Sequence, residues 1–215
     1  IVLRSQGPVK HKQHAAEDRQ QRDKFILTKG MVRAFIGAFF LMFSQGALAY
    51  LLPQHVESLG FSSRLSGTLM SLFGLTAVLV FTLPTNKLFD RVPTSVSLST
   101  GIGLMGISQV LIGQSTEPWL LYIILAVYGL GFAMLFPSIN KLLIHSTPKG
   151  NRGQAYGIFY ALFSIGSVAS SFGLGALALP LPALFMLTGV MLLACAIGEA
   201  IVSGRSHAAK HSSSA

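Results

Sequence analysis

The stretch GQAYGIFYALFSIGSVASSFGLGALALPLPALFMLTGVMLLACAIG, residues 153–198, contains no Asp, Glu, Lys or Arg. Its 46 residues are enough for two membrane-spanning helices of about 20 residues each. The two prolines of LPLP, at 179–182, favour a turn between these helices, because proline has no amide hydrogen to donate. Buried helices of a soluble protein would carry a charged face, and this stretch has none. It therefore predicts a hairpin of transmembrane helices.

The rest of the chain has the same character. Of its 215 residues, 51% are hydrophobic and 11% are charged, whereas soluble domains carry about 25% charged residues. Four more uncharged runs occur, at 34–56, 65–86, 92–116 and 118–140. We therefore expect an all-α integral membrane protein whose six transmembrane helices lie near residues 32–54, 62–84, 94–114, 118–144, 154–178 and 182–203.

Three parts of the chain follow from this reading. Residues 1–30 are polar and basic, and we expect them to form a cytoplasmic segment. Residues 31–203 form the six-helix transmembrane domain. Residues 204–215 are small and polar, and we expect a disordered cytoplasmic tail.

Lys and Arg lie almost entirely on one side of the predicted topology. Fifteen of the 16 fall before the first helix, after the last, or in the second and fourth loops, and only Arg64 falls on the other side. Cytoplasmic loops carry this excess of Lys and Arg. We therefore expect a multi-pass protein of the cell membrane with both termini in the cytoplasm. The net charge of +9 follows this topology, so the expected partner is the lipid bilayer and no nucleic acid is required.

The second cytoplasmic loop contains NKLFDR, residues 86–91. It resembles the loop motif Gly-x-x-x-Asp-Arg-x-Gly of the major facilitator superfamily: Asp90 and Arg91 match the charged pair, while Asn86 and Pro93 replace the glycines. Residues 129–167 are similar to that family's tenth helix, the loop after it and its eleventh helix. The resemblance covers about residues 20–203.

This resemblance implies the C-terminal half of a twelve-helix transporter, with an N-terminal six-helix half in the same longer chain or in a separate one. It implies secondary active transport, namely proton-coupled efflux of a small organic molecule. The first, second, fourth and fifth helices would border the central cavity or the partner half, and the third and sixth would support them. A truncated non-transporting membrane protein or an assembly subunit is the alternative function.

Conformational gating is the role that the resemblance implies for the charged loop pair Asp90 and Arg91. The alternative is that both are loop charges that obey the positive-inside rule. Arg152 opens the fifth helix and is a further gate candidate. Pro137 should bend the fourth helix, because it removes an amide donor within it.

Neutral polar side chains inside the spans are the candidates for lining a substrate cavity. On the fifth helix Tyr156, Tyr160 and Ser164 share one polar face with Ser167 and Ser171; the alternative is that the hydroxyls bond to the backbone. Gly166, Ala169 and Gly173 lie on another side, where a neighbouring helix should approach closely. Gln45, in the middle of the first helix, faces either the cavity or a neighbouring helix. The remaining cavity candidates are Tyr50, Tyr128 and Asn140, whereas Gln109 is expected to be structural.

No ionisable side chain lies near the middle of any predicted span. Glu199 and His145 fall near cytoplasmic ends, and we expect both to be interfacial. A proton carrier is therefore expected outside these 215 residues. The chain carries no enzyme motif, and its histidines lack metal-ligand spacing. We expect no enzymatic activity, cofactor or metal, and we expect Cys195 to serve packing.

Overall fold

The structure is a computed structural model that describes residues 25–82 and 92–212. Within these ranges the chain forms long helices and no strand. The long helices are α2 (Lys29–Ser58), α3 (Ser63–Thr82), α5 (Thr94–Gln114), α6 (Pro118–Ser146), α7 (Arg152–Ala176) and α8 (Leu181–Ser212), and the short 3-10 helix η1 (Lys149–Asn151) precedes α7. All six are long and apolar enough to cross a membrane, so the predicted all-α fold with six spans is confirmed.

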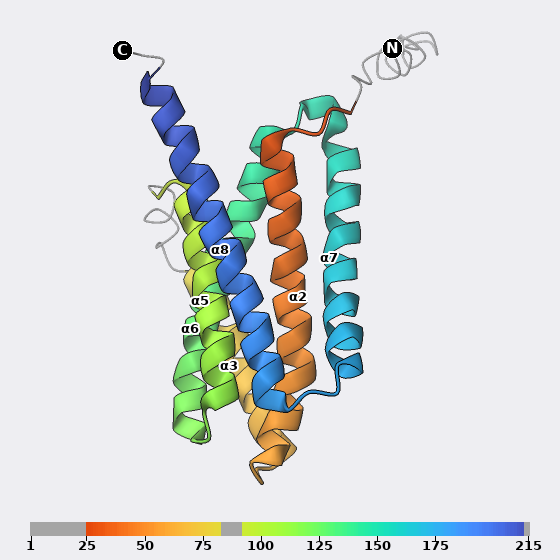
Figure 1. Cartoon of the computed structure of the whole chain (residues 1–215), viewed down its shortest axis with the longest axis vertical. Helices are drawn as coiled ribbons and strands as arrows, with labels where there is room; N and C mark the ends of the chain where they lie inside the picture. The colour runs from red at the N-terminus through yellow and green to blue at the C-terminus, as the bar shows by residue number, and fades with distance from the viewer. Residues whose placement is uncertain (1–24, 83–91, 213–215) are drawn as a thin grey trace, which may run out of the picture.

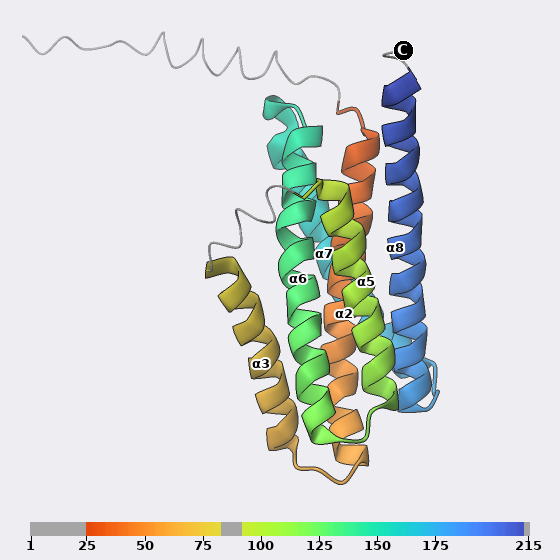
Figure 2. The same ribbon diagram turned by 90° about the vertical axis from the view of Figure 1, so that its left-hand side faces the viewer.

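The six helices form one upright bundle in which the start of α2 and the end of α8 lie at the same end (Figure 1). We call this the termini end. α2 packs mainly against α7 and α6, while α5 packs against α8 and α6. α3 lies outside α6 and leans away from it toward Thr82 (Figure 2). The third and sixth spans, α5 and α8, therefore form a closely packed pair on one side of the bundle.

The helix ends differ from the predicted ones mainly at the two ends of the chain. α2 begins at Lys29 rather than near residue 32, so Lys29 lies in its first turn. α8 continues to Ser212, and the prediction of a disordered tail was wrong for residues 204–212. No proline interrupts this part of the chain, and its alanines and Lys210 favour a helix. The loop motif with Asp90 and Arg91 lies outside the described residues.

Glycines lie where the helices cross most closely. A Cβ atom added to Gly101 of α5 would lie 2.9 Å from the carbonyl oxygen of Gly131 of α6. A Cβ atom added to Gly189 of α8 would lie 2.7 Å from the carbonyl oxygen of Gly106 of α5. Real side chains do not tolerate such distances to backbone atoms. These crossings therefore depend on the absence of a side chain, as small-residue crossings in membranes commonly do.

The predicted small-residue face of α7 is confirmed in part. Gly166 packs on α2, where an added Cβ atom would lie 2.5 Å from the Phe39 carbonyl oxygen. Gly173 has nothing within 4 Å of an added Cβ atom, so its predicted close contact was wrong. The second close approach is instead made by Ser170, which is fully buried against Gly46 of α2.

We expect Gly131→Ala to lower the thermal stability of the protein. The added methyl group meets the α5 backbone, and overpacking of this kind costs about 1–3 kcal/mol. Gly74→Ala on α3 is the matched control, since its Cβ atom would have nothing within 4 Å and Ala favours helices over Gly. Melting of the two purified variants in detergent measures the difference. Equal melting temperatures would contradict the close crossing of α5 and α6.

Candidate functional site

Four helices meet in a buried polar network near the middle of α2. The hydroxyl of Tyr128 on α6 lies 2.8 Å from the hydroxyl of Ser44 on α2 and donates to Gln45 Oε1 at 3.1 Å. On α5, the amide nitrogen of Gln109 donates to the Ser44 carbonyl oxygen at 2.9 Å and to its hydroxyl at 3.2 Å. Thr188 on α8 donates to Gln109 Oε1 at 3.3 Å. The network satisfies polar groups that would otherwise be buried without partners.

The hydrogen bonds of this network all point the same way, from Thr188 through Gln109, Ser44 and Tyr128 to Gln45. Because Tyr128 donates its only hydroxyl hydrogen to Gln45, the shared contact with Ser44 needs Ser44 as the donor. The carbonyl oxygen of the Gln45 amide is thereby occupied. Gln45 is half-buried, and no described residue accepts a hydrogen bond from its Nε2. Its amide hydrogens are therefore the free donors at the end of the network.

A strip of aromatic rings leads away from Tyr128. Phe73 of α3 lies edge-on to Tyr128, with ring centroids 5.4 Å apart, and edge-on to Phe132 of α6 at 5.5 Å. Phe132 stacks on Phe136, one turn further along α6, with centroids 5.9 Å apart. Tyr128 itself is fully buried, whereas Phe132 and Phe136 are half-buried. The aromatic strip thus joins the buried network to a more exposed part of α6.

The aromatic strip ends at an apolar pocket of about 540 Å³ between α3 and α6. The pocket lies toward the termini end, where α3 leans away from α6 (Figure 2). Its lining residues are Phe81, Phe136, Pro137, Asn140, Lys141, Ile144 and His145. Two predicted residues, Pro137 and Asn140, are therefore brought together here. The Asn140 amide nitrogen donates to the Phe136 carbonyl oxygen at 3.0 Å, and no described residue donates to its side-chain oxygen.

The predicted polar face of α7 carries the remaining tyrosines. Tyr156 and Tyr160 stack with ring centroids 6.2 Å apart, and Tyr160 is 56% exposed. Ser164 is also exposed. Further along, Ser171 donates to the Ser167 carbonyl oxygen at 3.3 Å. The hydroxyls of Tyr156, Tyr160 and Ser164 have no partner among the described residues, whereas Ser171 bonds to the backbone as the alternative proposed. The cavity-lining role of this face stays a prediction.

Two predicted residues lie apart from this site. Tyr50 lies in the second half of α2, away from the termini end, and its hydroxyl approaches Gly175 of α7. Arg152 is the first residue of α7. It is half-buried, and no described residue accepts a hydrogen bond from its buried Nε.

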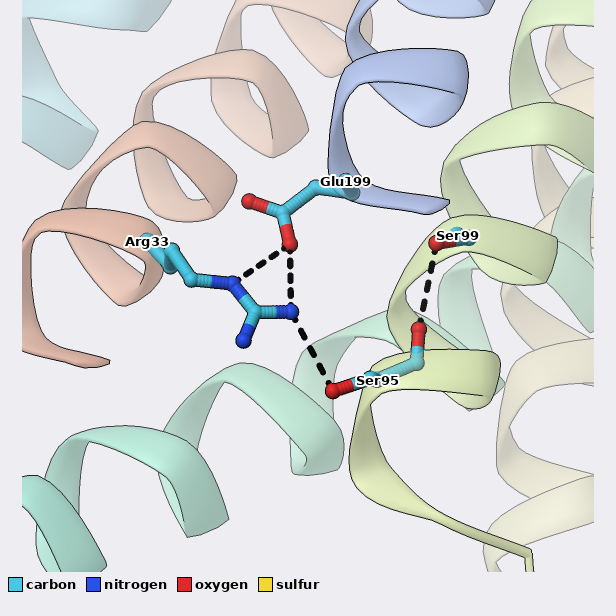
Figure 3. A network of polar contacts seen from close by, with 4 residues as sticks. All are labelled: Arg33, Ser95, Ser99 and Glu199. Atoms are coloured by element: carbon cyan, nitrogen blue, oxygen red, sulfur yellow. Dashed lines mark hydrogen bonds and ion pairs between the residues drawn. The ribbon is translucent and has the colours of Figure 1, made fainter. Parts of the chain in front are cut away.

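At the termini end an ion pair links three helices (Figure 3). Arg33 of α2 donates to Glu199 Oε2 of α8 from Nε at 2.8 Å, and its Nη2 lies 2.7 Å from the same oxygen. Nη2 also donates to the Ser95 hydroxyl of α5 at 3.2 Å. We expected Glu199 to lie at the membrane interface, near the end of a span. In the structure its side chain is buried and paired with Arg33.

Sequence reasoning missed several of these groups. Ser44 and Thr188 carried no signal beyond a hydroxyl within an apolar run. Arg33 was counted only among the positive charges on the cytoplasmic side, so its pairing with Glu199 was not foreseen. His55 was also missed; it is buried near the end of α2, with Nε2 3.1 Å from the Ser115 carbonyl oxygen and no described partner for Nδ1.

We expect Tyr128→Phe to destabilise the protein by about 0.6 kcal/mol and by no more than about 1.7 kcal/mol, the average and the maximum that double-mutant cycles give for interhelical hydrogen bonds in a membrane. The substitution leaves Ser44 and Gln45 without their shared partner. Tyr122→Phe is the matched control, because its hydroxyl bonds Thr68 at 2.8 Å in an exposed position. Unfolding in mixed micelles compares the two variants. A larger loss for Tyr122→Phe would argue against a stabilising role for the buried network.

Comparison with known proteins agrees with this architecture. The sequence model of the family described as Major Facilitator Superfamily matches residues 34–214 of this chain. Two curated relatives, both named multi-drug resistance efflux pump PmrA and from two strains of Streptococcus pneumoniae, are 26% identical over 141 residues. The match covers 64% of this chain and 35% of each relative, so the chain spans about a third of their length. With six helices in its described residues that are long and apolar enough to cross a membrane, and a family match over most of its length, this multi-pass membrane protein belongs to the Major Facilitator Superfamily.

Proposed function

We propose that this chain is the C-terminal six-helix half of a secondary active transporter that exports a small organic molecule across the cell membrane, coupled to protons. The observation that carries the proposal is the row of contacting side chains from Gln45 through Tyr128 and the aromatic strip to the pocket between α3 and α6. Family membership and the similarity to efflux pumps support it. Members of this superfamily are generally not enzymes.

The chemistry of the path favours an amphipathic substrate. The rings of Phe132 and Phe136 offer an apolar surface, and Gln45 offers amide hydrogens to a substrate acceptor. Asn140 offers an acceptor at the pocket. Binding sites for small molecules commonly combine an apolar lining with a few placed polar groups. The proposed substrate therefore has an aromatic or aliphatic body and at least one hydrogen-bonding group.

The partner half is proposed to cover α3 and α7. In these two helices the share of buried residues is 22%, the lowest among the six spans. Their exposed faces include hydroxyls of Thr68, Tyr160 and Ser164, which suit a protein or water-filled surface better than lipid. Alternating access around a shared site needs two such halves.

The proton-binding group is proposed to lie in that partner half. In the described part of the chain the acids are Glu57, Glu117 and Glu199. Glu57 and Glu117 lie at helix ends, and Glu199 lies near the end of the apolar span Leu181–Gly204 of α8. Glu199 is already paired with Arg33. None of the three is near the middle of a span, where a carrier that both sides reach in turn would lie.

The proposed path is tested in the complete natural polypeptide, reconstituted in vesicles with a proton gradient. We expect Phe136→Ala to lower the export of a fluorescent amphipathic compound several-fold, since it removes the ring that joins the aromatic strip to the pocket. Phe61→Ala is the control, because Phe61 is exposed in the connection between α2 and α3.

The outcomes separate the proposal from its alternative. Equal export by the two variants would contradict a path along α6. No gradient-dependent movement of any amphipathic compound, with the protein folded, would instead favour a non-transporting membrane protein or an assembly subunit.

The proposed orientation, with both termini in the cytoplasm, predicts which positions an impermeant thiol reagent reaches. Single cysteines at Ser63 and Gln114, in a background without other cysteines, should react from outside intact cells. Cysteines at Lys149 and Gly150 should react only after the cells are opened. All four positions are exposed in the bundle, so burial does not explain a difference. The opposite pattern would reverse the orientation.

A further inference from the structure

A second cavity lies on a different side of the bundle, between α2 and α8. It has a volume of about 590 Å³ and an almost entirely apolar lining. We call it the α2/α8 groove and define it by Ile36, Phe40, Met191, Cys195, Gly198 and Val202. Ile36 is 41% exposed and Met191 is 37% exposed, so the groove opens sideways from the bundle. Apolar surface that faces outward from a spanning helix suits lipid acyl chains.

One end of this groove is charged. Arg33 and Glu199 line it, and Arg33 lies in the first turns of α2, at the termini end of the bundle. Two nitrogens of the Arg33 guanidinium are bonded to Glu199 and Ser95, while the third, Nη1, has no partner among the residues drawn in Figure 3. Arg33 therefore keeps free donor capacity at the charged end of an apolar groove.

Lys29 adds a second cation on the same side of α2. It lies four residues before Arg33, and Ile36 and Phe40 follow at the spacing of one helical face. Lys29 is exposed. The Arg33 charge is balanced by Glu199, so Lys29 leaves one net positive charge where the apolar lining ends. Cations at the end of a membrane-spanning helix favour a negatively charged lipid headgroup.

We propose that the α2/α8 groove binds one anionic phospholipid from the membrane leaflet at the termini end. One acyl chain lies along Ile36, Phe40 and Met191. The phosphate accepts hydrogen bonds from Lys29 and from Nη1 of Arg33. The inference rests on the shown membrane fold and on this groove, and it does not depend on the proposed substrate path.

Gly198 provides a direct test, because an added Cβ atom there would have nothing within 4 Å. Gly198→Leu should therefore fill the groove without disturbing helix packing. Gly74→Leu is the matched control: Gly74 is also in a span and has the same open surroundings, but it lies on α3, away from the groove. Lys29→Gln tests the headgroup contact separately.

The experiment uses the complete natural polypeptide in vesicles that contain phosphatidylglycerol and phosphatidylcholine. A phosphatidylglycerol with a photoactivatable group on one acyl chain is crosslinked, and the labelled peptides are identified by mass spectrometry. We expect labels concentrated on residues 32–40 and 191–202, and competition by unlabelled phosphatidylglycerol but not by phosphatidylcholine. Glycerol phosphate, which lacks acyl chains, should not compete.

The variants should separate the two parts of the site. Gly198→Leu should reduce groove labelling to background while Gly74→Leu leaves it unchanged. Lys29→Gln should lower the preference for phosphatidylglycerol over phosphatidylcholine about fivefold, the effect of losing one cation near the membrane surface.

Three results would overturn the proposal. Labels spread evenly over all six helices would show ordinary contact with bulk lipid. Equal competition by the two lipids would remove the headgroup preference. Absence of label from the groove, with labels elsewhere, would show that another protein segment or a second copy of the chain covers it.

Discussion

The arrangement of the bundle depends on close backbone contact between helices at glycines. α5 is at the centre of this constraint: Gly101 meets Gly131 of α6, and Gly106 meets Gly189 of α8. In a membrane, apolar side chains gain little by leaving lipid for another helix, so association relies on close packing and on polar contacts. Glycine allows both helices to bring their backbones together, and the crossings then fix the height and rotation of each helix.

The buried polar network follows from those crossings. Gln109 lies one turn from Gly106 on α5, so the glycine crossing with α8 brings its amide within reach of Thr188. The same amide reaches Ser44 of α2, which in turn contacts Tyr128 of α6. Packing and hydrogen bonding therefore specify the same arrangement, and each reinforces the other. At the termini end, Arg33 and Glu199 join α2 and α8 again.

Not all helices are held with the same strength. α3 buries only Ser66, Leu69, Phe73 and Ala77 within the bundle. Its ring contact through Phe73 and its crossing at Gly129 fix it against α6 at one level. Beyond that level the two helices separate, and the pocket lies in this separation. The candidate substrate path thus begins in the most tightly bonded part of the molecule and ends beside one of its least buried helices.

The sequence by itself determined the fold class, the six spans and the placement of the start of α2 and the end of α8 at one end of the bundle. The fold class and the spans depend on the lengths of the apolar runs, which are properties of single segments. The shared end follows because an even number of spans returns the chain to the side where it started. It also placed Gln109 correctly as a structural residue. It left Gln45 open between the cavity and a neighbouring helix, and the structure shows why: its oxygen bonds Tyr128 while its amide nitrogen stays free.

Only the tertiary structure decided which distant residues meet. Arg33 and Glu199 are 166 residues apart in sequence, and no local pattern indicates that they pair. Gly166 and Gly173 share a helix face, yet only Gly166 contacts α2. The aromatic strip, the pocket between α3 and α6 and the α2/α8 groove likewise form only where helices meet. The physical reason is that such contacts depend on where the helices cross and how each is rotated, and a single helix sequence does not specify either.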